Sequence, residues 1–135
     1  MALKILIVED EFVSRTKLQK ILSILGEVHH ACNGKEAEQA FLLAHDEGTP
    51  YHLITVDINL PDTSGTEVVR HIRSYEKAND IHKTGEDVKI LMVTAHSGKN
   101  VMDSFKEGCE GYIVKPFDSM KISRVLHQIG IKLIS

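Results

Sequence analysis

The chain has 135 residues, 42% hydrophobic and 26% charged, which is the composition of an ordinary globular protein with room for one domain. Its 16 basic and 19 acidic side chains give a net charge of −3, which disfavours direct binding to nucleic acid or to an anionic membrane surface. Cys32 and Cys109 stand far apart and follow no secretory leader, so we expect no disulfide scaffold and a cytoplasmic location.

Apolar runs alternate along the chain with stretches of helical periodicity. The runs, typical of strands buried on both faces, cover residues 3–8, 28–31, 53–56, 89–93 and 111–114. Apolar residues spaced for one helix face occur at 18–25, 37–44, 68–75 and 122–129. A further helix over 98–108 is expected mainly because parallel strands need a crossover there. This alternation predicts an α/β fold with a parallel sheet and helices on both faces.

Two local features complete the expected elements. Asp118 stands directly before the last helical stretch and is its predicted N-cap. The segment from Glu76 to Asp87 is polar and charged, with a single isoleucine, so we expect the end of a helix running into a solvated loop.

Polar residues stand at the carboxyl ends of four of the apolar runs. They are Glu9, Asp10, Asp57, Thr94 and Lys115. Open parallel sheets bind ligands outside the carboxyl ends of their strands, so these side chains are expected to share one crevice. Any one of them alone is more often a helix cap or a loop residue, but five together indicate a site. Three gathered carboxylates repel one another unless a cation joins them, which predicts a Mg²⁺ site suited to accepting a phosphoryl group.

Four motifs resemble those of the response-regulator receiver domains of two-component signalling. They are residues 7–11 (IVEDE), 56–65 (VDINLPDTSG), 93–95 (VTA) and 111–117 (GYIVKPF). The resemblance covers nearly the whole chain. It implies a flavodoxin-like (βα)5 three-layer sandwich with parallel strands in the order 2-1-3-4-5. It also implies a single receiver domain over residues 1–135, with a core of about 3–130 and a short C-terminal tail.

The resemblance further implies how the acidic residues are used. Asp57 would accept a phosphoryl group from a histidine kinase or a histidine phosphotransfer protein. Asp10 and Asp57 would bind Mg²⁺ directly, Glu9 through water, and Asn59 through its backbone carbonyl. Glu9 replaces an aspartate that is common in the family, and its longer side chain should still reach the ion through water.

The remaining implied roles concern the phosphorylated state. Thr94 and Lys115 would contact the phosphoryl group, and Thr94 and Tyr112 would move together as the switch. The peptide bond that follows Lys115 would be cis. Asn59 and His96, two residues after Asp57 and Thr94, would border the phosphoryl group and tune its loss.

A chain of this kind is expected to act through other proteins and to be no enzyme beyond its own phosphorylation and dephosphorylation. A downstream protein would bind the face formed by the fourth helix, the fifth strand and the last helix, and the chain would be a monomer or a phosphorylation-dependent dimer. An aspartate-nucleophile phosphatase usually has a second aspartate where this chain has Asn59. A flavodoxin-like cofactor binder would not place Glu9, Asp10 and Glu11 beside a phosphate, and an interaction module without phosphorylation would not need the full acidic set.

Overall fold

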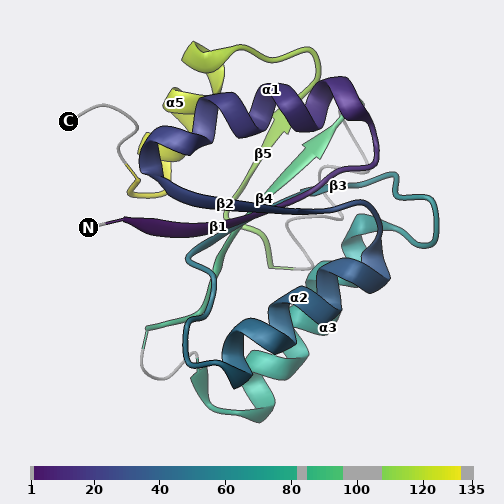
Figure 1. Ribbon diagram of the computed structural model, residues 1–135, viewed down its shortest axis with the longest axis vertical. Helices are drawn as coiled ribbons and strands as arrows, with labels where there is room; N and C mark the ends of the chain where they lie inside the picture. Colours follow the sequence, from purple (N-terminus) through teal and green to yellow (C-terminus); the bar gives the residue numbers. More distant parts are fainter. Residues whose placement is uncertain (1, 82–84, 96–107, 132–135) are drawn as a thin grey trace.

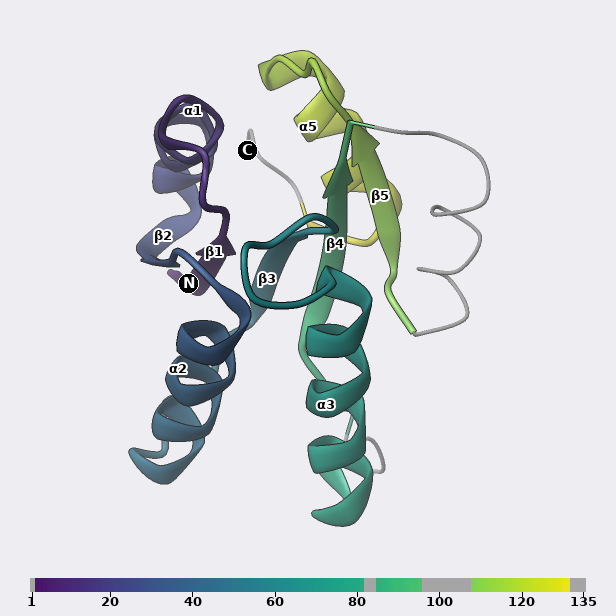
Figure 2. The same cartoon turned by 90° about the vertical axis from the view of Figure 1, so that its right-hand side faces the viewer.

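The computed structural model describes residues 2–81, 85–95 and 108–131, which form a five-stranded parallel sheet between helices. The strands are β1 (Leu3–Val8), β2 (Gly26–Ala31), β3 (Leu53–Asp57), β4 (Lys89–Thr94) and β5 (Gly111–Val114). Their order in the sheet is β2-β1-β3-β4-β5, and every neighbouring pair is parallel (Figure 2). The predicted strand order is therefore confirmed.

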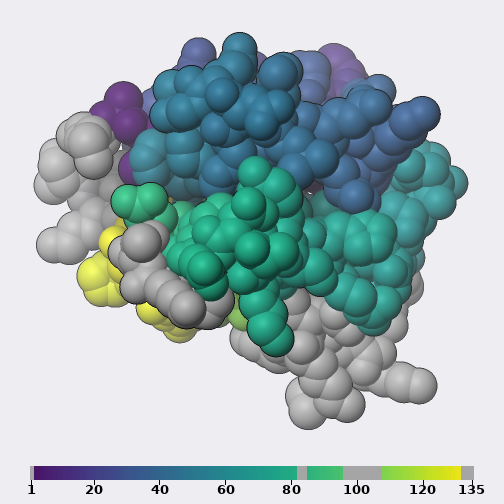
Figure 3. Space-filling model, turned by 90° about the horizontal axis from the view of Figure 1, so that it is seen from below, coloured from purple at the N-terminus to yellow at the C-terminus, as the bar shows by residue number. Residues whose placement is uncertain are grey.

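Helices cover both faces of this sheet and complete three layers. They are α1 (Phe12–Leu22), α2 (Gly34–Asp46), α3 (Gly65–Ala78) and α5 (Ser119–Gln128), with a short 3₁₀ helix over Ser23–Leu25. Figure 1 shows α1 and α5 on one face and α2 and α3 on the other, and Figure 3 shows α2 and α3 side by side. The helix expected over 98–108 falls, apart from its last residue, outside the described residues. Within them, no helix has both the length and the apolar character that crossing a bilayer requires.

The apolar core has two halves, one on each side of the sheet. Along β1, Leu6 and Val8 face α2 and α3, whereas Ile5 and Ile7 face α1 and α5. All four side chains are buried, so β1 has no polar face. This is the physical reason for the apolar run from Ile5 to Val8.

Side-chain caps fix the starts of three helices. The Asn33 carboxamide oxygen accepts from the Glu36 N–H at 2.8 Å at the start of α2. Ser64 caps α3 in the same way, and Asp118 Oδ1 accepts from the Lys121 N–H at 2.8 Å, which confirms the predicted cap of α5. Such caps are worth about 1 kcal/mol each.

A partly buried ion-pair network lies at the end of the sheet where β4 begins. Arg73 of α3 contacts Glu76 at 2.6 Å and Glu110 at 2.7 Å. The same two carboxylates accept from the backbone N–H groups of Val88 and Ile90, each at 2.7 Å. We call Arg73, Glu76 and Glu110 the Arg73 network. It corrects the expectation for residues 76–87 at Glu76 alone, which is only 1% exposed and is held by these partners. As predicted, helix α3 ends within this segment, at Ala78, and residues 77–80 and 85–87 are exposed.

A buried hydroxyl in β3 makes the first testable prediction. Thr55 is 1% exposed, and among the described residues its Oγ1 has no hydrogen-bond partner. Because an unpaired buried polar group is costly, Thr55→Val should raise the free energy of unfolding by about 1 kcal/mol, measured by urea denaturation. The control is Thr66→Val, which removes a hydroxyl that is bonded to Ser64 and should bring no gain. A loss of stability in Thr55→Val would contradict the prediction.

Candidate functional site

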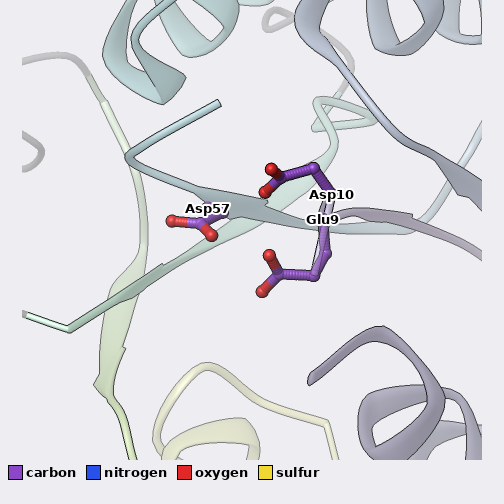
Figure 4. Close-up of side chains that lie close together, drawn as sticks. All are labelled: Glu9, Asp10 and Asp57. Atoms are coloured by element: carbon purple, nitrogen blue, oxygen red, sulfur yellow. The ribbon is translucent and has the colours of Figure 1, made fainter. Parts of the chain in front are cut away.

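Three carboxylates meet at the carboxyl edge of the sheet. Val8 pairs with Val56 in the register of β1 and β3, so Glu9 and Asp57, one residue further on, lie side by side. One carboxylate oxygen each from Glu9, Asp10 and Asp57 lies within 4.8 Å of the others, and Figure 4 shows Glu9 and Asp10 reaching toward Asp57. Glu9 and Asp57 are 1% and 6% exposed, whereas Asp10 is open to solvent. We call these three residues the acidic cluster.

Lys115, directly after β5, brings a positive charge to the acidic cluster. Its Nζ lies 2.9 Å from Glu9 Oε1 and 3.2 Å from Asp57 Oδ2. Its backbone N–H donates to the carbonyl of Thr94 at 2.7 Å, and the peptide bond to the following proline is cis, as the resemblance implies. Lys115 therefore joins the ends of β1, β3, β4 and β5 at one point.

One ammonium group does not neutralise three carboxylates, and the pKa values reflect this. Burial, chiefly, and the neighbouring Asp57 raise the pKa of Glu9, Lys115 lowers it, and the net result is a pKa of about 7. Burial lowers the pKa of Lys115, but the two carboxylates outweigh burial, so its pKa is raised. The cluster thus holds more negative charge than its own lysine balances.

The residues present fit a hard divalent cation. Glu9 Oε1 is buried and, within the described part of the chain, has no hydrogen bond of normal geometry, although Lys115 forms an ion pair with it. Carboxylate oxygens gathered at this spacing are the ligands that Mg²⁺ prefers, and the exposure of Asp10 leaves a side open for water or phosphate oxygens. The acidic cluster is thus a candidate Mg²⁺ site, as predicted.

Of the other candidate residues, three lie within the described part of the chain: Asn59, Thr94 and Tyr112. The Asn59 N–H donates to Asp57 Oδ1 at 3.0 Å, so Asn59 stands at the cluster. Thr94 ends β4, the strand next to β3, and its side chain is fully buried. Tyr112 lies on β5 opposite Met92 and is 38% exposed. His96 lies outside the described residues.

Two residues that hold the site in place were not identified from the sequence. Arg15, one turn into α1, donates to the backbone carbonyl of Glu9 at 3.1 Å. Asp62, in the loop after β3, accepts from the backbone N–H groups of Gly34 and Lys35 at 2.8 and 3.0 Å. Neither residue is at a strand end, and the partners of Asp62 are remote in sequence. Only the place of Asp62 inside the motif over residues 56–65 gave a signal.

The doubly wound sheet with acidic residues at its carboxyl edge defines a known class of protein. Residues 5–127 match the family model of the response regulator receiver domain, and the chain belongs to this family. Members of the family are regulatory domains of two-component systems and are generally not enzymes.

Individual relatives agree with this assignment. A chemotaxis protein CheY homolog of Campylobacter jejuni is 32% identical over 130 residues, which cover 94% of this chain and 92% of that protein. The chemotaxis response regulator CheY4 of Vibrio cholerae has a TM-score of 0.74 at 26% identity, over 96% of this chain and 99% of that one. The receiver domain of the sensor histidine kinase PA1611 of Pseudomonas aeruginosa has a TM-score of 0.75 at 26% identity, over 96% and 99% of the two chains. That structure has a magnesium ion coordinated in its active site cleft.

Proposed function

We propose that this chain is a single receiver domain that accepts a phosphoryl group on Asp57 and passes the signal on by binding another protein. The observation that carries the proposal is the acidic cluster with Lys115 across it, 3.2 Å from Asp57 and 2.9 Å from Glu9. Phosphoryl transfer depends mainly on positioning and on neutralising charge, and both are supported by this arrangement.

In the proposed reaction, an Asp57 carboxylate oxygen attacks the phosphorus of a phosphohistidine. An O–P bond forms, the P–N bond breaks, and its electron pair returns to the ring nitrogen. The other ring nitrogen already has a proton, so neutral imidazole leaves and Asp57 becomes an acyl phosphate. The Asn59 N–H and Lys115 hold the two carboxylate oxygens of Asp57 in place before the attack.

The remaining residues act on the phosphoryl oxygens. Mg²⁺, held by Asp10, Asp57 and the Asn59 carbonyl, and by Glu9 through water, would neutralise charge on these oxygens. The Lys115 ammonium stays close to Asp57 and stabilises the added negative charge.

The output of the proposed switch is a change of surface. The Thr94 hydroxyl moves toward a phosphoryl oxygen and donates a hydrogen bond to it, and Tyr112 changes its exposure as Thr94 moves. The charge of the phosphoryl group thereby shifts the equilibrium between two conformations of this surface. A downstream protein then binds the face of β5 and α5 together with the fourth helix, and the chain remains monomeric or dimerises on phosphorylation. Asn59 and His96 tune the lifetime of the phosphoryl group.

The proposed donors are a histidine kinase or a histidine phosphotransfer protein. The proposed compartment is the cytoplasm, which the two free cysteines, Cys32 and Cys109, support because a reducing compartment keeps thiols unpaired. The chain's only proposed chemistry is its own phosphorylation and dephosphorylation.

The test is incubation with acetyl phosphate and Mg²⁺ followed by intact-mass measurement. We expect a gain of about 80 Da, one phosphoryl group, that is absent in Asp57→Asn and absent when EDTA replaces Mg²⁺. Asp46→Asn, an exposed change at the end of α2, is the matched control and should keep the gain. A parent protein that gains no mass under conditions that label another receiver would refute the proposal.

A further inference from the structure

The loop between β3 and α3 is closed at its base. The Gly65 N–H donates to the Ile58 carbonyl at 2.7 Å, and Asn59 forms an isolated antiparallel bridge with Ser64. Residues 58–65 therefore form a compact loop, which we call the 58–65 loop. This loop contains Asn59, whose N–H holds Asp57 Oδ1 at 3.0 Å.

The tip of the 58–65 loop is fastened to another part of the chain. Asp62 Oδ1 accepts from the Gly34 N–H at 2.8 Å, and Asp62 Oδ2 accepts from the Lys35 N–H at 3.0 Å. Both donors belong to the first turn of α2, where backbone N–H groups have no partner within the helix. We call these two hydrogen bonds the Asp62 clamp. The two N–H groups hold the pKa of Asp62 below its usual value, so the carboxylate stays ionised at neutral pH.

Packing strengthens the Asp62 clamp. Gly34 is buried against Thr63, and a Cβ added at residue 34 would lie 2.4 Å from Thr63 Cγ2. The close approach of the loop to the helix therefore depends on the absence of a side chain at Gly34. The loop rests on the helix along two neighbouring residues, Asp62 and Thr63.

The start of α2 is itself fixed, so the clamp joins the loop to a rigid support. Asn33 caps the Glu36 N–H, and the Glu36 carboxylate accepts from the Cys32 N–H at 2.9 Å. Arg15 Nη1 contacts Cys32 Sγ at 3.6 Å and the Glu9 carbonyl at 3.1 Å, which ties the same segment to the end of β1. The loop after β3 and the loop after β1 are thus both braced by the start of α2.

We propose that Asp62 is a positioning residue of the phosphoacceptor site, which keeps the Asn59 backbone at the acidic cluster by fastening the 58–65 loop to α2. Asp62 itself contacts none of the three carboxylates in the acidic cluster; it acts through Asn59 on Asp57. The inference rests on the proposed function, because the Asn59 backbone matters for signalling only if the acidic cluster binds Mg²⁺ and Asp57 accepts the phosphoryl group.

The test compares Asp62→Ala with a variant that weakens the same helix end without touching the loop. Asn33→Ala removes the cap hydrogen bond of α2 and leaves the Asp62 clamp in place, so it is the matched control. Two quantities are measured in each protein: the Mg²⁺ dissociation constant by titration calorimetry, and the hydrogen-exchange protection of the Asn59 amide by NMR. Neither measurement depends on phosphorylation activity.

Loss of a residue that orients metal ligands typically weakens metal binding by tenfold or more, so Asp62→Ala should raise the Mg²⁺ dissociation constant by about tenfold. It should also lower the protection of the Asn59 amide, whereas Asn33→Ala, which weakens the support but keeps both hydrogen bonds of the Asp62 clamp, should have a much smaller effect on both quantities. Asp62→Asn keeps one acceptor oxygen for the Gly34 N–H and should fall between Asp62→Ala and the parent. Asp62→Asn also provides the test if Asp62→Ala does not fold.

The possible outcomes separate this inference from the proposed function. Unchanged Mg²⁺ affinity and unchanged Asn59 protection in Asp62→Ala would overturn the positioning role, and so would equal losses in Asp62→Ala and Asn33→Ala. If the parent gains no mass with acetyl phosphate, yet Asp62→Ala selectively weakens Mg²⁺ binding and exposes the Asn59 amide, the proposed function fails while the positioning role stands.

Discussion

Replacing Arg73 by methionine is expected to lower the free energy of unfolding by about 3–5 kcal/mol, as is usual when one partner of a buried ion pair is removed. The substitution keeps much of the side-chain length and removes the guanidinium. The buried carboxylate of Glu76 then loses its cation, and Glu110 loses a bidentate partner at 2.7 and 3.0 Å. An uncompensated buried charge is costly because the protein interior solvates it poorly. Urea denaturation at pH 7 measures the loss.

Arg70→Met is the matched control for Arg73→Met. Arg70 lies one turn earlier on α3, its side chain is 51% exposed, and it pairs with Glu67 at the surface. Exposed pairs contribute little, so the control should lose no more than about 1 kcal/mol. If both variants lose the same amount, the Arg73 network does not stabilise the fold as described. Whatever fraction of Arg73→Met remains folded should still gain mass with acetyl phosphate, because the network lies away from the acidic cluster.

Gly65→Ala is expected to have a large effect on the proposed phosphoryl transfer, although it leaves the phosphoacceptor side chain in place. A Cβ at residue 65 would lie 2.2 Å from the carbonyl oxygen of Asp57 and 2.9 Å from the Ile58 Cα. Both neighbours are backbone atoms, so either the end of β3 or the start of α3 must move. A shift of about 1 Å at a reacting group can cost a factor of about 100 in rate. We therefore expect the phosphorylation rate, followed by intact mass over time, to fall by about 100-fold.

The Gly65→Ala substitution should also lower stability by about 1–3 kcal/mol, the usual cost of overpacking. The control is Gly48→Ala, where the backbone has φ of +76° and no atom lies within 4 Å of the added Cβ. This change strains the backbone by about 1 kcal/mol but should leave the phosphorylation rate at the parent value. A parent-like rate in Gly65→Ala would show that the backbone of Asp57 tolerates displacement.

The sheet and the acidic cluster could be predicted because they depend on the strands themselves. A strand that is buried on both faces reads as an apolar run, as in β1 and β3, and the residue that ends the run marks the carboxyl edge. Since neighbouring parallel strands end at the same edge, Glu9 and Asp57 had to meet once the order was right. β2 was predicted two residues too short, because this edge strand is only half-buried and Glu27 interrupts its apolar pattern.

The contacts that brace the site were not predictable in the same way. Asp62 and Gly34 lie 28 residues apart, and nothing in either local pattern names the other as its partner. Glu76 reads as part of a polar loop, since burial of a glutamate depends on Arg73 and on the Val88 N–H, which only the folded chain brings to it. Local patterns report which residues avoid water, whereas these polar contacts are set by the tertiary arrangement.

Strand β4 runs from the Arg73 network to the edge of the sheet where the acidic cluster lies. At its beginning, the Ile90 N–H donates to Glu110 of the Arg73 network, and at its end stands Thr94, beside the strand of Asp57. These positions are four residues apart, roughly 13 Å along an extended strand. Energetic effects of changes at such separated sites usually add. Substitutions at the beginning of β4 can therefore raise the thermal stability without changing the rate of the proposed phosphoryl transfer at its other end.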